Sequence, residues 1–230
     1  EWLQRYGAIG KLGDRAGDTL RYTRPQAALL DSLLMEDERT EVSIDKAFAR
    51  LRQKLKTFSG IKSVSPPATF KGELRPYQKE GLGWLHYLDD FGFGGCLADD
   101  MGLGKTVQTL ALLQAQKEQG LREPSLLVMP TSLIYNWLLE AEKFTPQLRV
   151  LVYTGSYRDK NTELFDQYDL ILTSYGIVRI DVDLLKYYRF NYIILDESQA
   201  IKNPSSNIAK AVMQLNARHR LILTGTPLEN

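Results

Sequence analysis

The sequence predicts an α/β fold with a mostly parallel sheet and helices on both faces of that sheet. Six short apolar runs alternate with helical stretches from residue 74 onward. Most of these runs are nearly continuous in apolar residues, which is typical of parallel strands covered on both sides. In an open sheet of this kind, ligands bind beyond the carboxyl ends of the strands. The predicted strands are residues 95–99, 125–130, 149–154, 169–174, 192–197 and 220–225.

The helical stretches lie between most of these strands, and residues 1–70 lack the alternation. The sequence therefore predicts two regions. Residues 1–70 form a small helical N-terminal extension with a linker, and residues 71–230 form the α/β domain. The predicted helices of the domain are residues 77–89, 105–118, 132–144 and 205–216.

Two amphipathic helices are predicted in the extension, at residues 25–39 and 43–58. Between Lys46 and Lys71 there are seven basic residues and no acidic one. This stretch is either a phosphate-contacting surface or an ordinary solvated helix face, and the second interpretation is favoured. The "SPPATF" at residues 65–70 predicts a linker, because paired prolines stop a helix. The apolar face of the second helix comprises Ile44, Phe48, Leu51, Leu55 and Phe58.

Composition limits the classes of protein to which the chain can belong. Its 230 residues and 43% apolar content leave room for one large α/β domain with a sizeable core. A net charge of +1 means that any nucleic-acid surface must be local. The single cysteine, Cys96, excludes an internal disulfide framework and suits a reducing compartment. No apolar run approaches the ~20 residues of a membrane span.

The segment "CLADDMGLGKTVQTLALL", residues 96–113, has the features of a phosphate-binding loop between a strand and a helix. Gly104, Lys105 and Thr106 fit the end of the pattern G-x-x-x-x-G-K-[ST], but Asp99 replaces its first glycine. In such a loop, N–H groups and the helix N-terminus point at phosphate oxygens. Lys105 would reach the β- and γ-phosphates, and the Thr106 hydroxyl would hold Mg²⁺.

A second element, "YIILDESQ" at residues 192–199, places two carboxylates at the end of an apolar strand. Buried acids are costly unless they meet a cation or water. Downstream of a phosphate loop, Asp196 suits Mg²⁺, and Glu197 suits a general base that orients the attacking water. The structural alternative is a helix N-cap, for which Asp and Ser are good residues. Together, the loop and the acidic pair predict a nucleoside-triphosphate hydrolase.

Six motifs follow one another along the α/β part of the chain. They are "LRPYQKEGLGWL" (74–85), "LADDMGLGKT" (97–106), "VMPTSLIYNWLLEAEKF" (128–144), "ILTSYGIVRID" (171–181), "IILDESQAIKN" (193–203) and "LILTGTPLEN" (221–230). In this order they resemble the first RecA-like motor lobe of the Swi/Snf family, which are helicase-like ATPases of superfamily 2. The resemblance implies DNA-dependent ATP hydrolysis, translocation on duplex DNA and remodelling of protein–DNA complexes. It does not extend to residues 1–70.

The resemblance accounts for the first position of the loop, since an acidic residue commonly stands there in the family, as Asp99 does here. The chain departs from the family at Asp100, where glutamate is more common, and at Ser198, where alanine or glycine is usual. The resemblance implies that Gln78 forms hydrogen bonds with the adenine edge and so selects ATP over GTP. The implied ATP-binding residues are Gln78, Asp99, Met101, Gly102, Leu103, Gly104, Lys105 and Thr106; the implied catalytic residues are Lys105, Asp196 and Glu197, with the metal held by Thr106 and Asp196.

Nucleic-acid contacts are implied after other strands. Thr131 and Ser132 would stand at a helix N-terminus, where hydroxyls and amides can hold a backbone phosphate. Thr173 and Ser174 are placed in the same manner. By themselves these residues favour ordinary N-capping, whereas the resemblance favours nucleic-acid contact. The residues implied to couple the nucleotide state to the nucleic acid are Thr224, Gly225 and Thr226.

The resemblance implies ATP and Mg²⁺ as cofactors, and duplex DNA, a DNA-bound protein and a second RecA-like lobe as partners, with no membrane. The second lobe, absent from these 230 residues, would supply arginine fingers, so the chain alone is expected to bind ATP and hydrolyse it slowly. Alternatives are an RNA helicase lobe, a P-loop kinase, and a nucleotide-gated nucleic-acid-binding module without motor activity. Trp137 and Tyr175 are expected to be buried. In a bacterium the protein is expected in the cytoplasm, associated with the nucleoid. In a eukaryote it is expected in the nucleus.

Overall fold

The computed structural model divides the chain into two compact units. The first unit comprises residues 1–60 and 91–93. The second comprises residues 61–90 and 94–230 and contains the six motifs of the sequence analysis. The residues that the structure describes are 14–16, 19–23, 26 and 46–225.

The first unit contains a short antiparallel hairpin that the sequence analysis did not predict. Its strands are β1 (Asp14–Ala16) and β2 (Thr19–Arg21). Strands of three residues are too short to show an alternation of apolar and polar positions, so the expectation of helices alone was incomplete.

A helix of the first unit lies within one of the two predicted amphipathic segments. Helix α3 (Lys46–Lys56) falls inside residues 43–58. It buries Leu51 and exposes Arg50 and Lys54, as the spacing of its apolar residues requires. The other predicted helix, at residues 25–39, lies outside the described residues except for one position.

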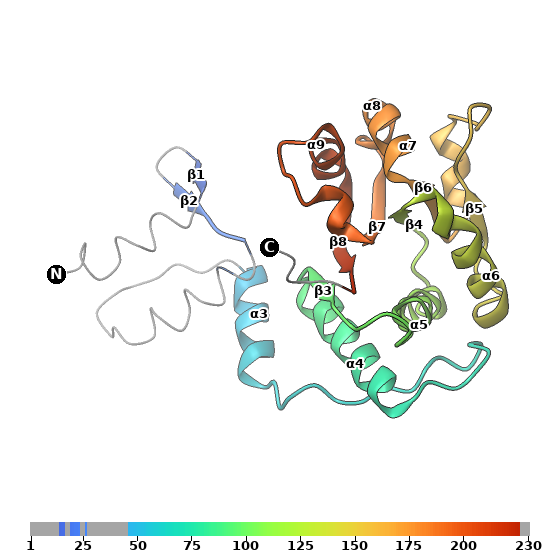
Figure 1. The fold of residues 1–230 in the computed structure, drawn as a ribbon. Coiled ribbons are helices and arrows are strands. Elements are labelled where there is room, and N and C mark those ends of the chain that lie inside the picture. Colours follow the sequence, from blue (N-terminus) through green and yellow to red (C-terminus); the bar gives the residue numbers. More distant parts are fainter. Residues whose placement is uncertain (1–13, 17–18, 24–25, 27–45, 226–230) are drawn as a thin grey trace. The chain divides into compact units, whose positions relative to one another are not determined.

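A six-stranded sheet forms the centre of the second unit (Figure 1). Its order is β3-β8-β7-β4-β6-β5, and each of these pairings is parallel. This confirms the predicted α/β fold. The strands are β3 (Gly95–Leu97), β4 (Ser125–Met129), β5 (Val150–Val152), β6 (Leu170–Ser174), β7 (Arg189–Asp196) and β8 (Asn216–Leu223).

Helices cover both faces of this sheet (Figure 1). They are α4 (Pro76–Phe91), α5 (Lys105–Glu118), α6 (Ile134–Phe144), α7 (Tyr175–Ile180), α8 (Val182–Leu185) and α9 (Asn207–Gln214). Helices α4 to α6 pack on strand residues such as Leu127 and Leu172, and α7 to α9 pack on the alternate residues, such as Leu126 and Ile171. Within the described residues, no helix has both the length and the apolar character to cross a membrane.

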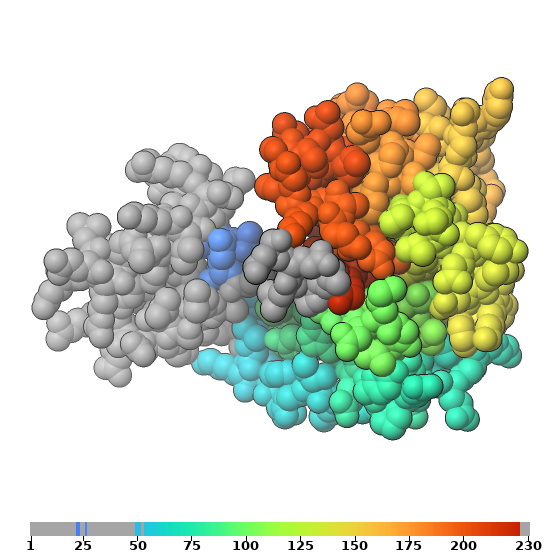
Figure 2. Space-filling view, in the orientation of Figure 1, coloured from blue at the N-terminus to red at the C-terminus, as the bar shows by residue number. Residues whose placement is uncertain are grey.

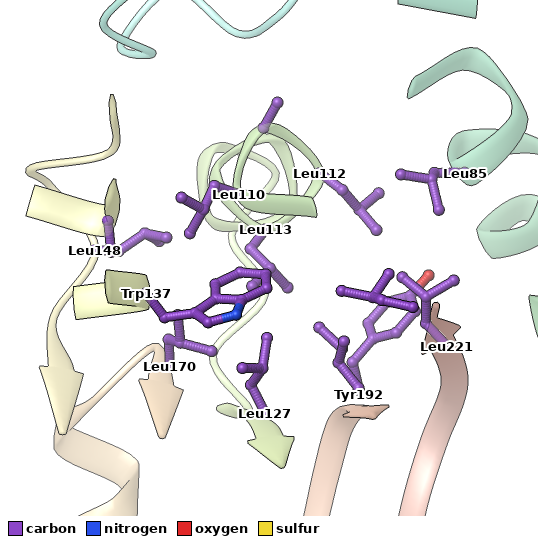
Figure 3. Packing of buried hydrophobic residues seen from close by; sticks show 14 of the residues in the cluster. Leu85, Leu110, Leu112, Leu113, Leu127, Trp137, Leu148, Leu170, Tyr192 and Leu221 are labelled. Carbon is purple, nitrogen blue, oxygen red and sulfur yellow. The ribbon is translucent and has the colours of Figure 1, made fainter. Parts of the chain in front are cut away.

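The apolar cluster beneath α5 and α6 fixes one large side chain in place. Figure 3 shows the Trp137 ring among Leu110 and Leu113 of α5 and Leu127 and Leu170 of the sheet. These side chains are almost completely excluded from water, and burial of each stabilises the fold by about 1.5–3 kcal/mol. The indole is therefore held between helix and sheet.

The register of the strands brings their carboxyl ends to one edge of the sheet. Leu97 of β3 is level with Leu223 of β8, which is level with Asp196 of β7. Met129 of β4 is level with Ser174 of β6. Because the strands are parallel, the loops that follow these residues emerge together, where a ligand of an open α/β sheet is expected.

The segment before α4 packs against α6 and α4 within the second unit. Phe70 is buried and stacks on Phe144 of α6, with ring centroids 5.8 Å apart and an interplanar angle of 8°. The N–H of Lys71 donates to the Phe144 carbonyl at 2.7 Å, and the N–H of Val64 donates to the Lys79 carbonyl at 3.0 Å. Residues 61–70 thus belong to the second compact unit. The prolines of residues 65–70 prevent this segment from forming a helix, but they do not prevent Phe70 from packing on α6.

The predicted strands are all present, with differences at their ends. Strand β7 begins at Arg189 and β8 at Asn216, earlier than the predicted residues 192 and 220. The early part of β8 contains the polar residues Asn216, Arg218 and His219, so a search for continuous apolar runs does not find it. Helices α7 and α8, of six and four residues, were missed because they are too short to show helical periodicity.

A buried ion pair holds the loop after β5. Arg158 Nε lies 2.6 Å from Asp181 Oδ2, and the Tyr153 hydroxyl donates to the same oxygen at 2.8 Å. Burial tends to raise the pKa of Asp181, but hydrogen bonds from Arg158 and Tyr153 outweigh it and lower that pKa below its usual range. Burial, and then the hydrogen bond to Asp181, raise the pKa of Tyr153 to about 12, so the hydroxyl stays protonated.

Asp181→Asn should destabilise the protein in a pH-dependent manner. Because the pKa of Asp181 is lower in the folded state than in the unfolded state, its charge stabilises the fold above the unfolded pKa, and that contribution is lost as the pH falls toward the folded pKa. At pH 7 we expect a loss of about 3 kcal/mol, because Arg158 is left buried without its partner. Urea unfolding across the acidic range measures the difference.

The control is Asp183→Asn, since Asp183 is exposed and its pair with Lys186 lies at the surface. This substitution should change stability little at any pH. A loss in Asp181→Asn that stays constant down to acid pH would contradict the ion-pair explanation.

Candidate nucleotide-binding site

Two glycines in the left-handed region shape the loop between β3 and α5. Gly102 has a φ of 83° and Gly104 a φ of 82°, values at which a Cβ would be strained. Gly104 is the N-cap of α5, so the first N–H groups of the helix open toward the loop. Asp100 and Met101 are exposed. Figure 2 shows the green segment around residue 100 at the surface.

Lys105, the first residue of α5, reaches back across the loop. Its Nζ donates to the Asp99 carbonyl at 2.7 Å and to the Asp100 carbonyl at 3.2 Å. An ammonium group carries three donors, so these contacts leave a third for a phosphate oxygen. The side chain lies in the loop in which a phosphate-binding lysine is required.

The acidic first residue of the loop has a partner that the sequence analysis missed. Gln108 is buried and donates from Nε2 to Asp99 Oδ2 at 2.8 Å. Gly81 of α4 makes room for this amide, because a Cβ at Gly81 would stand 1.9 Å from Gln108 Oε1. The available signal was the helical spacing of four residues from Gly104, which places Gln108 next to the loop.

Two neighbouring residues of α4 brace the other side of the loop. Gln78 Nε2 donates to the Leu103 carbonyl at 3.0 Å, and the Tyr77 hydroxyl donates to the same oxygen at 3.1 Å. Gln78 Oε1 accepts the N–H of Arg75 at 2.9 Å. An amide has a second N–H and a second lone pair, so Gln78 retains capacity for an adenine edge. Tyr77 was not predicted to take part.

Asp196, the last residue of β7, is a buried carboxylate with both oxygens hydrogen-bonded. Trp137 Nε1 donates to Oδ2 at 2.8 Å, and the N–H of Glu197 donates to Oδ1 at 3.0 Å. Burial raises the pKa of Asp196, while these two N–H groups and the charge of Lys105 oppose the rise. A divalent cation would favour the ionised carboxylate in the same way as Lys105 does.

Glu197 ends the strand in a strained turn. With φ 49° and ψ 57°, it is the one residue other than glycine with a positive φ in the described part of the chain. Such a conformation costs on the order of 1–3 kcal/mol and is typical of functional sites. The Glu197 side chain is half-buried, and its Oε2 accepts a hydrogen bond from Gln199 Nε2 at 2.6 Å.

The segment after β8 adjoins the loop. The N–H of Thr224 donates to the Leu97 carbonyl at 3.2 Å. A Cβ at Gly225 would stand 3.1 Å from Met101 Cγ and 3.9 Å from Lys105 Nζ. Two of the residues assigned to coupling thus lie beside the loop, and the third, at position 226, is outside the described residues.

Among the candidate nucleic-acid contacts, Thr131 and Ser132 are exposed. They belong to a 3₁₀ turn (Thr131–Leu133) that continues directly into α6. Ser174 is instead the N-cap of α7, and its Oγ accepts the N–H of Ile177 at 3.3 Å. Its hydroxyl thus caps the helix, which is the alternative to nucleic-acid contact that the sequence analysis considered for this residue.

Thr173 is not available for a nucleic-acid contact, which corrects that expectation. Its side chain is 0% exposed, and its hydroxyl donates to the Tyr153 carbonyl at 2.8 Å. Successive residues of a strand point to opposite faces, so Thr173 and Ser174 cannot line one surface. Trp137 and Tyr175 are 2% and 5% exposed, so both are buried as expected.

The oxygen ligands at this edge fit Mg²⁺ with a nucleoside triphosphate. Thr106 offers a hydroxyl in the first turn of α5, and Asp196 offers a carboxylate. Mg²⁺ binds oxygen and usually keeps several waters or phosphate oxygens besides one or two protein ligands. Within the described residues, no group of three or more His, Cys, Asp and Glu side chains could hold a metal ion.

A parallel sheet that carries a glycine-shaped loop with a lysine after one strand, and paired carboxylates after another strand, defines a RecA-like P-loop ATPase core. The SNF2-related domain family matches residues 77–230, so the chain belongs to that family of helicase-like ATPases. This confirms the resemblance that the six motifs predict.

Relatives and a solved structure agree with this assignment. The TATA-binding protein-associated factor BTAF1 of Arabidopsis thaliana is 41% identical over 201 residues, covering 83% of this chain and 10% of that protein. Helicase SWR1 of Debaryomyces hansenii is 43% identical over 178 residues, covering 75% of this chain and 11% of that protein. The Sulfolobus solfataricus SWI2/SNF2 ATPase core in complex with double-stranded DNA is 41% identical with a TM-score of 0.66, covering 75% of this chain and 35% of that chain.

The chain corresponds to only a part of these proteins. It spans from 10% to 21% of the length of the curated relatives that it matches. The activities and partners of the longer relatives are therefore matters of proposal for this chain.

Gly104→Ala should weaken nucleotide binding and lower stability. The new Cβ would be strained at φ 82° and would stand 2.5 Å from Gln78 Nε2, displacing an amide that braces the loop. The left-handed backbone alone costs about 1–2 kcal/mol for a residue with a Cβ. Thermal unfolding and the dissociation constant for Mg-ATP measure the two effects.

Gly120→Ala is the matched control, because Gly120 has a φ of 84° with open space around its Cβ position, past the far end of α5. It should lose a similar amount of stability from backbone strain and keep its nucleotide affinity. Equal nucleotide affinities for the two variants would argue against the bracing role of Gln78.

Proposed function

We propose that residues 71–230 are the ATP-binding first lobe of a motor that translocates on duplex DNA and remodels protein–DNA complexes. The observation that carries this proposal is the convergence of Lys105, Asp196 and the exposed Thr131–Leu133 turn at one edge of the sheet. The similarity to an archaeal ATPase core described in complex with double-stranded DNA supports DNA as the track.

ATP would bind with its phosphates against the loop and the N-terminus of α5. Lys105 would turn from the loop carbonyls toward the β- and γ-phosphates, exchanging two neutral acceptors for charged ones. Gln78, braced by the Leu103 carbonyl, would meet the adenine edge. Mg²⁺, when bound, neutralises phosphate charge, and Thr106 and Asp196 are the residues that would hold it.

Glu197 is the proposed general base. It would orient a water molecule and accept its proton as the water oxygen bonds to the γ-phosphorus and the bond to ADP breaks. The Gln199 amide, 2.6 Å from Glu197 Oε2, would fix the orientation of the carboxylate. Lys105 would stabilise the charge that develops on the phosphoryl oxygens.

The Thr131–Leu133 turn would contact the DNA backbone through its exposed hydroxyls and amides. Ser174, which is 7% exposed and caps α7, would lie next to the same backbone at the start of that helix. Contacts of this type track phosphates and carry no sequence information, so we expect little base specificity. The closeness of Gly225 to Met101 supports the proposal that the segment after β8 would respond to the state of the loop.

DNA-stimulated ATP turnover is the decisive test of this function. The full-length protein that contains these residues is assayed without nucleic acid and with duplex DNA, single-stranded DNA or RNA. We expect duplex DNA to stimulate turnover most strongly. Lys105→Ala should lower the stimulated rate by about 100-fold or more, because it removes a charge from the developing phosphoryl anion.

Other outcomes would favour the alternatives. Stimulation by RNA alone would place the protein with RNA helicases, and transfer of phosphate to an acceptor other than water would indicate a kinase. DNA binding that responds to nucleotide without any turnover would indicate a nucleotide-gated nucleic-acid-binding module.

Residues 1–230 alone should bind Mg-ATP but turn it over about 10³-fold or more slowly than the full-length protein with DNA, since arginine fingers would come from a second lobe. Isothermal titration measures the binding and a phosphate-release assay the rate. Rapid DNA-stimulated hydrolysis by the 230 residues would contradict this prediction.

A further inference from the structure

Two buried aromatic side chains donate hydrogen bonds to Asp196. Each belongs to a segment that the proposed function assigns to contact with nucleic acid. The Trp137 indole donates to Asp196 Oδ2 at 2.8 Å. The Tyr175 hydroxyl donates to the main-chain carbonyl of Asp196, also at 2.8 Å. With 2% and 5% of their surfaces exposed, the two rings shield these bonds from water.

Trp137 is connected to the exposed Thr131–Leu133 turn by continuous helix. The turn passes without a break into α6, which carries Trp137. The ring packs among leucines of α5 and the sheet (Figure 3). Because protein interiors are close-packed, a displacement of the turn would shift α6 and the indole N–H together.

Tyr175 makes the equivalent connection from the other face of the sheet. It is the first residue of α7, whose N-cap is Ser174. Its ring belongs to the apolar cluster beneath α7 to α9, whereas Trp137 belongs to the cluster beneath α5 and α6. Burial, and then the charges of Asp196 and Glu197, raise the pKa of Tyr175, so its hydroxyl remains a donor.

The bonds converge on the residues proposed for metal binding and catalysis. The second oxygen of the Asp196 carboxylate accepts the N–H of Glu197 at 3.0 Å. Glu197 is itself held in a left-handed conformation that depends on its surroundings. A small rotation of Asp196 would therefore change the turn that orients the proposed base.

We propose that Trp137 and Tyr175 are positioning residues that transmit nucleic-acid engagement at the Thr131–Leu133 turn and the start of α7 to Asp196 and Glu197. This inference rests on the proposed function. If bound duplex DNA shifts α6 and α7 and thereby changes the affinity for nucleotide at Asp196, then by linkage bound nucleotide changes the affinity for duplex DNA by the same factor.

The test measures this coupling rather than activity. The dissociation constant for a fluorescent duplex DNA is determined by anisotropy on the full-length protein, with and without a non-hydrolysable ATP analogue and Mg²⁺. The ratio of the two constants is the coupling factor. Trp137→Phe keeps an aromatic ring and removes the N–H, and Tyr175→Phe removes only the hydroxyl.

Tyr153→Phe is the matched control, because the buried Tyr153 hydroxyl also donates to a carboxylate, that of Asp181, at 2.8 Å. We expect the coupling factor to fall toward one, by about fivefold or more, in Trp137→Phe and Tyr175→Phe and to stay unchanged in the control. A packing role alone would weaken both DNA affinities equally and leave their ratio intact. If Trp137→Phe does not fold, Tyr175→Phe decides the outcome.

The two possible failures are distinguishable. A wild-type protein that binds no duplex DNA, or binds it equally with and without nucleotide, would remove the proposed motor function together with the inference. A coupled wild-type protein whose Trp137→Phe and Tyr175→Phe variants keep the full coupling factor would overturn the inference and leave the motor function standing.

Discussion

The parallel register of the sheet is the constraint on which the site depends. Strand β7 lies between β8 and β4. Its last residue, Asp196, is level with Leu223 of β8, which is itself level with Leu97 of β3, the strand that precedes the glycine-containing loop. Strand β4, which precedes the exposed turn, pairs with the other side of β7. Because successive side chains of a strand point to opposite faces of the sheet, the position of Asp196 in β7 decides which face its carboxylate takes. Tyr192 and Ile194 pack beneath α5, so Asp196 points to the same side, toward Trp137. A slip of one residue would turn the carboxylate to the opposite face, away from the indole that bonds it.

Local patterns were sufficient to predict the strands and the two central motifs. The apolar runs and the glycines around Lys105 are readable because neighbouring residues alone determine them. The partners of these motifs are not readable in this way. Gln108, Trp137 and Tyr175 reach the site only because a helix packs at a particular place on the sheet, and a single sequence carries no direct record of that packing.

The errors have equally specific physical causes. Thr173 and Ser174 were proposed together, although adjacent strand residues face opposite sides, and Thr173 is buried against Tyr153. The start of β8 was missed because three of its first four residues, Asn216, Arg218 and His219, are polar, unlike the continuous apolar runs used to find the other strands. The prolines of residues 65–70 predicted a linker, and in the structure Phe70 of this segment stacks on Phe144. Proline restricts the backbone without preventing burial.

At Glu197, the residue that would best stabilise the fold differs from the residue that the proposed reaction needs. Glycine would adopt the same φ of 49° without a Cβ penalty, and asparagine would adopt it at a lower cost than glutamate. Either residue would relax the turn and remove the carboxylate. With Glu197 as the proposed general base, random substitution at this position would favour a more stable lobe that lacks this base, and selection for the reaction would be needed to keep a glutamate there. Among descendants of this sequence, the residue at position 197 would record whether the chemistry was still needed.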